Sequence, residues 1–178
     1  AQRLLLLVNQ LLDLQKNQSG TMELQVTENN VYEFVTEIYC AFNQIAQTNE
    51  ITFTLDCRDR EFQAWYDKVL LEKVVFNLLS NAFKYTPSGK DIRMLVKCIP
   101  AGELEESYRK EVAPSALYMM LQVVDAGCGI PLQERDKVFT PFYRVPETAG
   151  VNVPGTGIGL SLVYSIVKLH KGAVSYTH

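Results

Sequence analysis

The chain has 178 residues and carries 17 Lys and Arg against 20 Asp and Glu, a formal net charge of −3. This length suits one domain, or one domain with a short appended element. Apolar residues make up 47% of the chain and charged residues 21%, as in soluble globular proteins, so a packed core is expected. The slightly acidic balance argues against a nucleic-acid-binding protein that depends on a broad basic surface.

Apolar runs and cysteines indicate the compartment. The run from Leu4 to Val8 is too short to cross a bilayer, and no secretory leader opens the sequence. The four cysteines are widely and irregularly spaced, and the chain has only two histidines, so neither a zinc site nor a disulfide framework is expected. These features predict a cytoplasmic domain with reduced cysteines and no membrane segment.

The first residues predict a helix. A seam of leucines follows the 3-4-3 spacing of a heptad: Leu4, Leu7, Leu11 and Leu14. An ordinary core helix and the end of a longer helix that packs against a second chain both fit this pattern, and we favour the second. Residues 17–20 are typical of a linker. This predicts a helical unit over residues 1–18 and a separate domain over residues 19–178.

The next part of the chain alternates between helical and strand patterns. A 3.6-residue period of apolar side chains predicts a helix over about 30–47, and alternation predicts strands over 51–55 and 62–66. Asp67 can cap a following helix, which the turn residues at 86–89 would end.

The second half adds strands, a long loop and a helix. Alternating runs at 92–98 and 117–124 predict a hairpin with a charged surface loop between its strands. Residues 131–156 are dense in proline and glycine, which indicates a long functional loop. A helix over about 160–170 and a strand over 173–176 follow. This order predicts an α+β fold, a two-layer α/β sandwich with one mixed sheet and helices on one face.

Three polar residues interrupt the predicted helix after Asp67. Asn77 and Asn81 are four residues apart and Lys84 follows three residues later, so all three share a face. A carboxamide oxygen can bind Mg²⁺, which takes few protein ligands and keeps most of its waters. A solvated polar stripe is the alternative interpretation.

Two glycine-containing segments stand at the ends of predicted elements. Asp125 to Ile130 follows an apolar strand, where glycines allow a ligand to approach the backbone closely. Gly155 to Leu160 opens the last long helix, whose free N–H groups and positive dipole end favour an anion. Taken singly, the first could be a tight turn, and the second is a weak signal.

Together these segments resemble the ATP-binding domain of sensor histidine kinases, within the gyrase, heat-shock chaperone and histidine kinase superfamily. Residues 77–86 (NLLSNAFKYT) resemble the N box of that family, and residues 125–130 resemble its first glycine box. Residues 138–144 (VFTPFYR) resemble the F box, and residues 155–160 resemble the second glycine box. The N-terminal helix resembles the end of the dimerisation and phosphotransfer hairpin.

The resemblance implies ATP and Mg²⁺ as ligands and assigns roles. Asn81 would bind Mg²⁺, and Asn77 beside it would support the metal and the phosphates. Lys84 would face the phosphates, and Tyr85 the ring or sugar of the nucleotide. Asp125 would accept a hydrogen bond from the adenine amino group, where guanine would present a repelling carbonyl oxygen.

The resemblance also makes residues 131–156 a lid over the nucleotide. Arg144 would reach the terminal phosphate as charge builds up during transfer. Glycines of the second glycine box would close around the phosphates. The remaining residues expected to line the nucleotide come from the glycine boxes and the F box: Gly127, Gly129, Ile130, Phe142, Gly155, Thr156, Gly157, Gly159 and Leu160.

One position separates branches of this superfamily. Its ATPases carry a glutamate four residues before the metal-binding asparagine, and this glutamate activates water. This chain has Asn77 there, which cannot act as a general base, so kinase activity is favoured over hydrolysis. An ATPase of the superfamily and a scaffold that binds no nucleotide remain the alternatives, and a serine kinase of the anti-sigma type fits less well.

Neither histidine of the chain is expected to accept phosphate. His170 falls at a predicted helix end, where a cation suits the dipole and the last carbonyl groups, and His178 belongs to no motif. The acceptor histidine would lie on the dimerisation hairpin, outside these residues. The resemblance implies a homodimeric parent, an aspartate of a response-regulator receiver domain as the next acceptor, and a parent that is an inner-membrane sensor.

Overall fold

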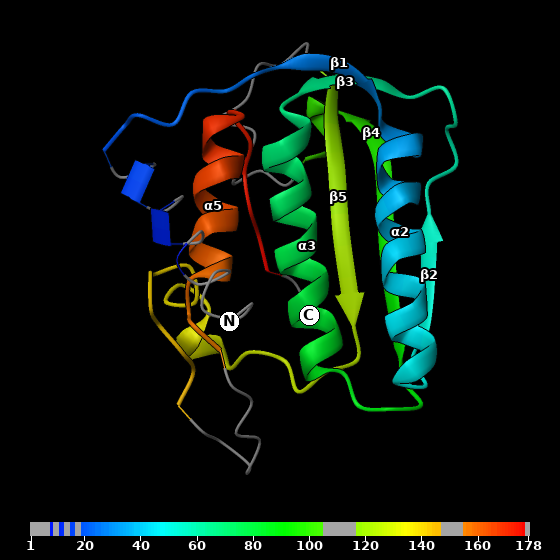
Figure 1. The fold of residues 1–178 in the computed structure, drawn as a ribbon, viewed down its shortest axis with the longest axis vertical. Coiled ribbons are helices and arrows are strands. Elements are labelled where there is room, and N and C mark those ends of the chain that lie inside the picture. The colour runs from blue at the N-terminus through cyan, green and yellow to red at the C-terminus, as the bar shows by residue number, and fades with distance from the viewer. Residues whose placement is uncertain are drawn as a thin grey trace.

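The computed structural model describes residues 8, 11–12, 15–16, 19–104, 117–146 and 155–176. Its elements, labelled in Figure 1, are in chain order β1 (Thr27–Asn30), α2 (Val31–Thr48), β2 (Thr52–Asp56), β3 (Gln63–Tyr66), α3 (Lys68–Tyr85), β4 (Asp91–Pro100), η1 (Ala101–Glu103), β5 (Leu117–Asp125), η2 (Leu132–Glu134) and α5 (Gly159–Leu169).

Both long helices begin at capping side chains. The side-chain oxygen of Asn30 accepts a hydrogen bond from the backbone N–H of Glu33 (3.0 Å), which starts α2. Asp67 Oδ1 accepts one from the N–H of Leu70 (3.0 Å), which starts α3. Each cap satisfies an N–H group that the first helical turn leaves unpaired. The predicted helix over 30–47 and the predicted cap at Asp67 are confirmed.

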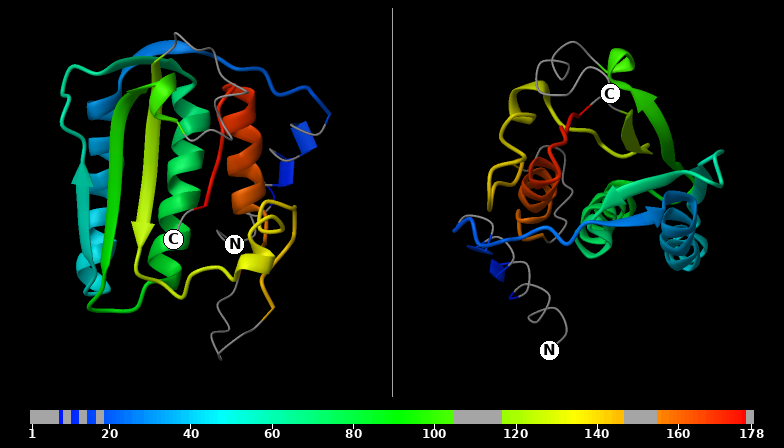
Figure 2. Two further views of the ribbon diagram at one scale, coloured as in Figure 1. Left: turned by 180° about the vertical axis from the view of Figure 1, so that it is seen from behind. Right: turned by 90° about the horizontal axis from the view of Figure 1, so that it is seen from above.

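The main sheet has three strands in the order β2-β4-β5. Strand β2 is parallel to β4, with Phe53 opposite Ile92, and β4 is antiparallel to β5, with Ile92 opposite Asp125. The helices lie together on one side of this sheet (Figures 1 and 2). The mixed sheet and the helices on one face confirm the predicted α+β sandwich.

A separate two-stranded sheet was not predicted. Strand β1 pairs antiparallel with β3, and Thr27 lies opposite Tyr66. The sequence of β1 is Thr-Glu-Asn-Asn, which contains no apolar residue and has low strand propensity. The predicted strand at 62–66 therefore exists, but outside the main sheet, so the expectation of one sheet was wrong.

The strand predicted over residues 173–176 is also absent, because residues 172–176 have no regular secondary structure. Val174 packs against the core, and the hydroxyl of Tyr176 accepts a hydrogen bond from the N–H of Ile130 (3.0 Å). An apolar segment that packs on the core is thus not sufficient for a strand, since a strand also requires a neighbour with a matching row of backbone hydrogen bonds.

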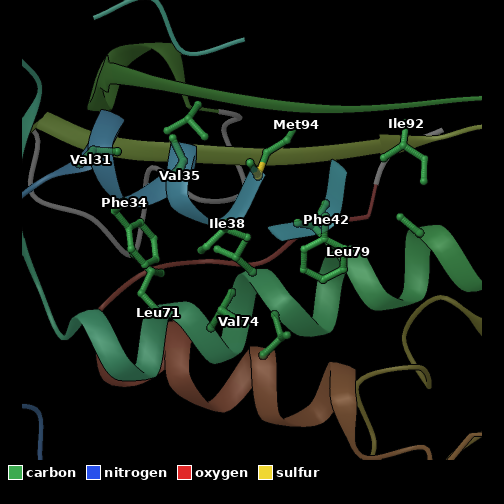
Figure 3. Close-up of a cluster of buried hydrophobic side chains, with 14 of the residues drawn as sticks. Val31, Phe34, Val35, Ile38, Phe42, Leu71, Val74, Leu79, Ile92 and Met94 are labelled. Carbon is green, nitrogen blue, oxygen red and sulfur yellow. The ribbon is translucent and has the colours of Figure 1, made fainter. Parts of the chain in front are cut away.

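The core lies between the sheet and the helices (Figure 3). Phe34 of α2, Leu79 of α3 and Met94 of β4 have 1% or less of their surface exposed. Dense packing of this kind leaves little freedom for rigid shifts of α3 against the sheet. The polar face of α3 is therefore held in a fixed position.

Parts of several predicted segments lie outside the described residues. Of the predicted N-terminal helix, residues 8, 11–12 and 15–16 are helical, and Val8, Leu11 and Leu12 are exposed. Residues 105–116 of the hairpin loop and 147–154 of the predicted lid are not described. No helix among the described residues is long and apolar enough to span a membrane.

Tyr66 is buried with an unpaired hydroxyl, which leads to a stability prediction. Only 3% of the residue is exposed, and no described residue forms a hydrogen bond with its hydroxyl. Burial, with a smaller contribution from the negative charge of Glu37, raises the pKa of Tyr66 to about 12. Removing an unpaired buried hydroxyl should be favourable, so Tyr66→Phe is expected to raise the free energy of unfolding at pH 7 by about 1 kcal/mol.

The same change should alter the pH dependence. Because the folded state disfavours the phenolate, the contribution of Tyr66 is complete below its unfolded pKa of about 10 and is lost as the pH rises to about 12. Urea unfolding at pH 7, 10 and 11 should show a shallower alkaline decline in Tyr66→Phe. Tyr39→Phe is the control for removing a hydroxyl that has a hydrogen-bond partner, because the Tyr39 hydroxyl donates to the carbonyl oxygen of Phe53 (3.3 Å). A loss of stability in Tyr66→Phe at pH 7 would contradict the prediction.

Candidate functional site

The predicted polar face is present on the C-terminal half of α3. Asn77, Asn81 and Lys84 are all partly buried there. The Nδ2 group of Asn77 donates a hydrogen bond to the carbonyl oxygen of Lys73 (2.7 Å), which fixes the orientation of the amide. The oxygen of this amide therefore points away from Lys73.

The start of α5 lies against Asn77. A Cβ atom placed on Gly159 would be 2.8 Å from Asn77 Oδ1, so the absence of a side chain allows the two helices to meet here. Among the described residues no side chain caps α5 at Ile158, so backbone N–H groups at its N-terminus can face a ligand. A carboxamide and a helix N-terminus thus converge, and a helix N-terminus favours anions.

Lys84 brings a positive charge to the same place. Its ammonium group donates a hydrogen bond to the hydroxyl of Tyr85 (3.0 Å) and lies 4.6 Å from the centre of that ring. A Cβ atom on Gly155 would be 2.7 Å from Lys84 Nζ. The first residue of the second glycine box therefore lies directly beside a lysine ammonium group.

Asp125 ends β5 at the same end of the molecule as the C-terminus of α3 and the start of α5 (Figure 1). The residue is exposed, and its Oδ1 accepts a hydrogen bond from the N–H of Gly127 (2.9 Å). A Cβ atom on Gly127 would be 2.9 Å from the carbonyl oxygen of Tyr85. Glycine at this position lets the first glycine box approach α3, with a carboxylate acceptor exposed beside it.

The F box and the second glycine box are joined through their backbones. The N–H of Phe142 donates a hydrogen bond to the carbonyl oxygen of Gly157 (2.9 Å). Gly157 has φ +71°, and a Cβ atom on it would be 2.6 Å from the carbonyl carbon of Phe142. Thr156 Oγ1 accepts a hydrogen bond from the N–H of Ile158 (3.2 Å), which shapes the turn into α5.

Glu134 is a residue of this region that the sequence interpretation missed. Its carboxylate accepts a hydrogen bond from the hydroxyl of Tyr143 and forms an ion pair with Lys137 (3.4 Å). Glu134 follows the first glycine box and Tyr143 belongs to the F box, so this contact ties the two segments together. The spacing of Glu134 and Lys137 was a visible signal, but the contact with Tyr143 required the chain to fold back.

Some predicted site residues are placed without a contact that tests their roles. Arg144 is exposed and lies two residues after Phe142, and Asn81 is partly buried on α3. Gly129 has φ +69°, a conformation that glycine adopts without strain. The phosphate role of Arg144 and the metal role of Asn81 stay predictions.

The oxygen donors of the site suit a metal ion with one or two protein ligands better than a metal ion coordinated entirely by side chains. Among the described residues, no group of three or more His, Cys, Asp or Glu side chains could hold a metal ion. Mg²⁺ bound together with phosphates needs only one or two protein oxygen ligands, such as the amide oxygens of Asn77 and Asn81. The arrangement can therefore bind a phosphate chain with its metal, and Asp125 can accept a hydrogen bond from a ring amino group.

Two histidine kinases are similar to this chain in sequence. Histidine kinase P4 of Formosa agariphila is 33% identical over 184 aligned residues, which cover 100% of this chain and 12% of that protein. Hybrid signal transduction histidine kinase D of Dictyostelium discoideum is 34% identical over 175 residues, which cover 98% of this chain and 11% of that protein. The chain thus spans only a small part of the length of these relatives.

A solved structure shares the fold of this chain, and a family model matches most of its sequence. Full-length ShkA in complex with AMPPNP has a similar fold, with a TM-score of 0.70 and 19% identity over 94% of this chain and 31% of that chain. The sequence model of the histidine kinase-, DNA gyrase B- and HSP90-like ATPases matches residues 66–178, which include α3, both glycine boxes and the F box. The chain therefore belongs to the family of histidine kinase-, DNA gyrase B- and HSP90-like ATPases.

Proposed function

We propose that this chain is the ATP-binding catalytic domain of a sensor histidine kinase, which transfers the γ-phosphoryl group of Mg·ATP to a histidine outside these residues. One observation carries the proposal: the polar face of α3 meets the second glycine box, with Asn77 against Gly159 and Lys84 against Gly155. A lysine, two carboxamides and a free helix N-terminus suit a polyphosphate chain.

The base of the nucleotide would lie between β5 and α3. The exposed carboxylate of Asp125 would accept a hydrogen bond from the adenine amino group, and its contact with the N–H of Gly127 fixes its direction. The ring of Tyr85, which is 38% exposed, would contact the base or the sugar. The bound AMPPNP of ShkA, a protein of similar fold, supports ATP as the ligand.

Asn81 would bind Mg²⁺, and Asn77 would support it. The bound metal would neutralise charge on the phosphates. The chain's own residues would do the rest: Lys84 and the N–H groups at the start of α5 would hold the phosphates, and Arg144 would approach the terminal phosphate. Residues 131–156 would act as a lid that excludes water from the phosphates.

In the transfer, a nitrogen of the acceptor imidazole would form a bond to the γ-phosphorus as the bond to the departing ADP oxygen breaks. Catalysis would consist of positioning and charge neutralisation. Asn77 stands where a base would activate water, and a carboxamide cannot accept that proton. Attack by water is therefore disfavoured, and ATP is kept for the histidine.

We place the acceptor histidine on a dimerisation hairpin whose last helix includes residues 1–18, with the catalytic domain over residues 19–178. The full-length protein would be a homodimer, would pass the phosphoryl group to the receiver domain of a response regulator, and would be an inner-membrane sensor with this domain in the cytoplasm. No role in nucleic-acid binding is proposed. The names of the two histidine kinase relatives support this context.

The experiment that tests the proposal follows the γ-phosphoryl group of labelled ATP in the presence of the hairpin. Label on a histidine of the hairpin is the expected result, because the site holds ATP without a base for water. Label released as inorganic phosphate would instead favour an ATPase.

A further inference from the structure

His170 joins the end of α5 to the beginning of α3, at the opposite end of these helices from the candidate site (Figure 1). Its Nε2 atom accepts a hydrogen bond from the backbone N–H of Asp67 (3.1 Å). A backbone N–H can only donate, so Nε2 carries no proton. The proton of the neutral ring is therefore on Nδ1, which lies 2.8 Å from the carbonyl oxygen of Ile166 and donates to it.

This geometry corrects the expected role of His170. The contact with a carbonyl group of the last helical turn is as predicted from the sequence. The second ring nitrogen, however, accepts a hydrogen bond, which a charged imidazolium cannot do. The structure therefore requires the neutral ring at a position where the helix dipole alone would favour a cation.

Asp67 connects this histidine to the segment that leads into the domain. The residue is buried, and both of its carboxylate oxygens accept hydrogen bonds. Oδ1 accepts from the N–H of Leu70 and caps α3 (3.0 Å), and Oδ2 accepts from the N–H of Gln25 (2.9 Å). Gln25 lies just before β1, in the segment that connects the N-terminal helical residues to the domain. One aspartate thus joins α5, α3 and the incoming segment.

We propose that neutral His170 is a proton-sensitive latch that supports the hydrogen bond between the N–H of Gln25 and the carboxylate of Asp67. Protonation would place an N–H of the imidazolium against the N–H of Asp67, so this hydrogen bond would be lost. The charged ring would also be drawn to the carboxylate of Asp67, where it would compete with the N–H of Gln25. The hydrogen bond of Gln25 would therefore weaken on protonation, while Met22 and Leu24 keep the segment packed against the core.

The electrostatic surroundings of the latch are mixed. The helices and the segment that meet at His170 carry both carboxylate and ammonium side chains, and the ammonium group of Lys68 is paired with Glu37 (3.1 Å). Tyr66 is neutral below pH 10, since burial raises its pKa to about 12. Besides Asp67, the titratable residues within two positions of Gln25, Asp67 or His170 along the chain are Glu23, Tyr66, Lys68, Lys168 and Lys171, and Glu37 joins them through Lys68.

The latch and the candidate site lie at the two ends of the same helix, α5. His170 stands at one end of this helix, and Gly159 at its other end lies against Asn77. The helix α3 runs alongside α5, with Asp67 at one end and the polar face at the other (Figure 1). The proposal goes beyond the proposed function and does not depend on it, because the latch can be measured without nucleotide.

NMR hydrogen exchange on the whole chain tests the proposal. The chain has two histidines, so the ¹⁵N shifts of their rings can be assigned with His178→Gln, which should leave the behaviour of the latch unchanged. We expect the neutral Nδ1–H form of His170 at about pH 8. Exchange is compared at about pH 8 and about pH 5: where the ¹⁵N shifts report a protonated ring, the protection factor of the Gln25 amide should be lower by about fivefold to tenfold. Amides of β4 should keep their protection.

Two variants separate a proton-sensitive latch from a merely structural contact. In His170→Gln the side-chain oxygen can still accept from the N–H of Asp67 but cannot titrate, so the protection of Gln25 should be retained at both pH values. In His170→Ala the protection of the Gln25 amide should be low at both pH values. An Nε2–H form at about pH 8, a ring that stays neutral to about pH 5, or an equal loss of protection in His170→Gln would each overturn the proposal. The first two readouts need no variant, so a failure of one to fold leaves the test intact.

Discussion

Asp125→Ala is expected to weaken ATP binding by about 10-fold to 100-fold, the effect of removing a hydrogen bond to a charged group. The substitution removes the exposed carboxylate that would accept a hydrogen bond from the adenine amino group. The N–H of Gly127 would also lose its acceptor, so the first glycine box would be less well ordered. Calorimetric titration of the chain with Mg·ATP measures the change in affinity.

Asp59→Ala is a matched control for this substitution. Asp59 is also exposed, and its Oδ1 accepts a hydrogen bond from the backbone N–H two residues on, that of Glu61 (3.0 Å), as Asp125 does from Gly127. Asp59 lies between β2 and β3, and neither of these strands contributes a residue to the candidate site. Equal losses of ATP affinity in the two variants would show that Asp125 does not recognise the base.

Gly157→Ala should disrupt the connection between the F box and the second glycine box. The new methyl group would lie 2.6 Å from the carbonyl carbon of Phe142 and 2.8 Å from the carbonyl oxygen of Tyr143. Backbone atoms cannot rotate away as a side chain can, so the segment must move. Overpacking of this kind typically costs about 1–3 kcal/mol, which predicts a loss of ATP affinity of about 5-fold to 150-fold if it falls on the bound conformation.

Gly89→Ala separates this clash from the strain of a positive φ. Gly89 has φ +77°, close to the +71° of Gly157, but nothing lies within 4 Å of a Cβ atom placed on it. Both variants should lose about 1–2 kcal/mol of stability from the backbone conformation in urea unfolding. Only Gly157→Ala should lose ATP affinity, and unchanged ATP binding in that variant would contradict the assigned role of the second glycine box.

Local patterns were sufficient for most of the fold. The caps at Asn30 and Asp67 and the apolar periods define α2 and α3, and alternation defines β4 and β5. Strand β1 was not predicted because its four residues contain no apolar side chain. Its pairing with β3 depends on the tertiary fold, which the local sequence does not show. The strand expected at 173–176 fails for the converse reason: Val174 packs against the core, but among the described residues no strand pairs with this segment.

The site residues could be predicted from motif order, but their contacts could not. Spacing along α3 places Asn77 and Lys84 on one face, yet only the fold shows that Gly159 and Gly155 lie against them. Glu134 was missed because its partner Tyr143 lies nine residues away, beyond helical spacing, in an irregular segment. Asp67 was predicted as a helix cap, and its contacts with residues far along the chain had no local signal.

The fate of the γ-phosphoryl group tests the central claim most directly. The chain would be incubated with Mg²⁺, ATP labelled in that group, and the histidine-bearing hairpin of the full-length protein, beside Asp125→Ala and a reaction without hairpin. The account predicts acid-labile label on the hairpin, an equal amount of ADP, and strong reduction of both in Asp125→Ala. Label that appears as inorganic phosphate at the same rate with or without the hairpin would contradict it and identify an ATPase. A folded chain that neither binds nor consumes ATP would contradict it as well, and would indicate a scaffold.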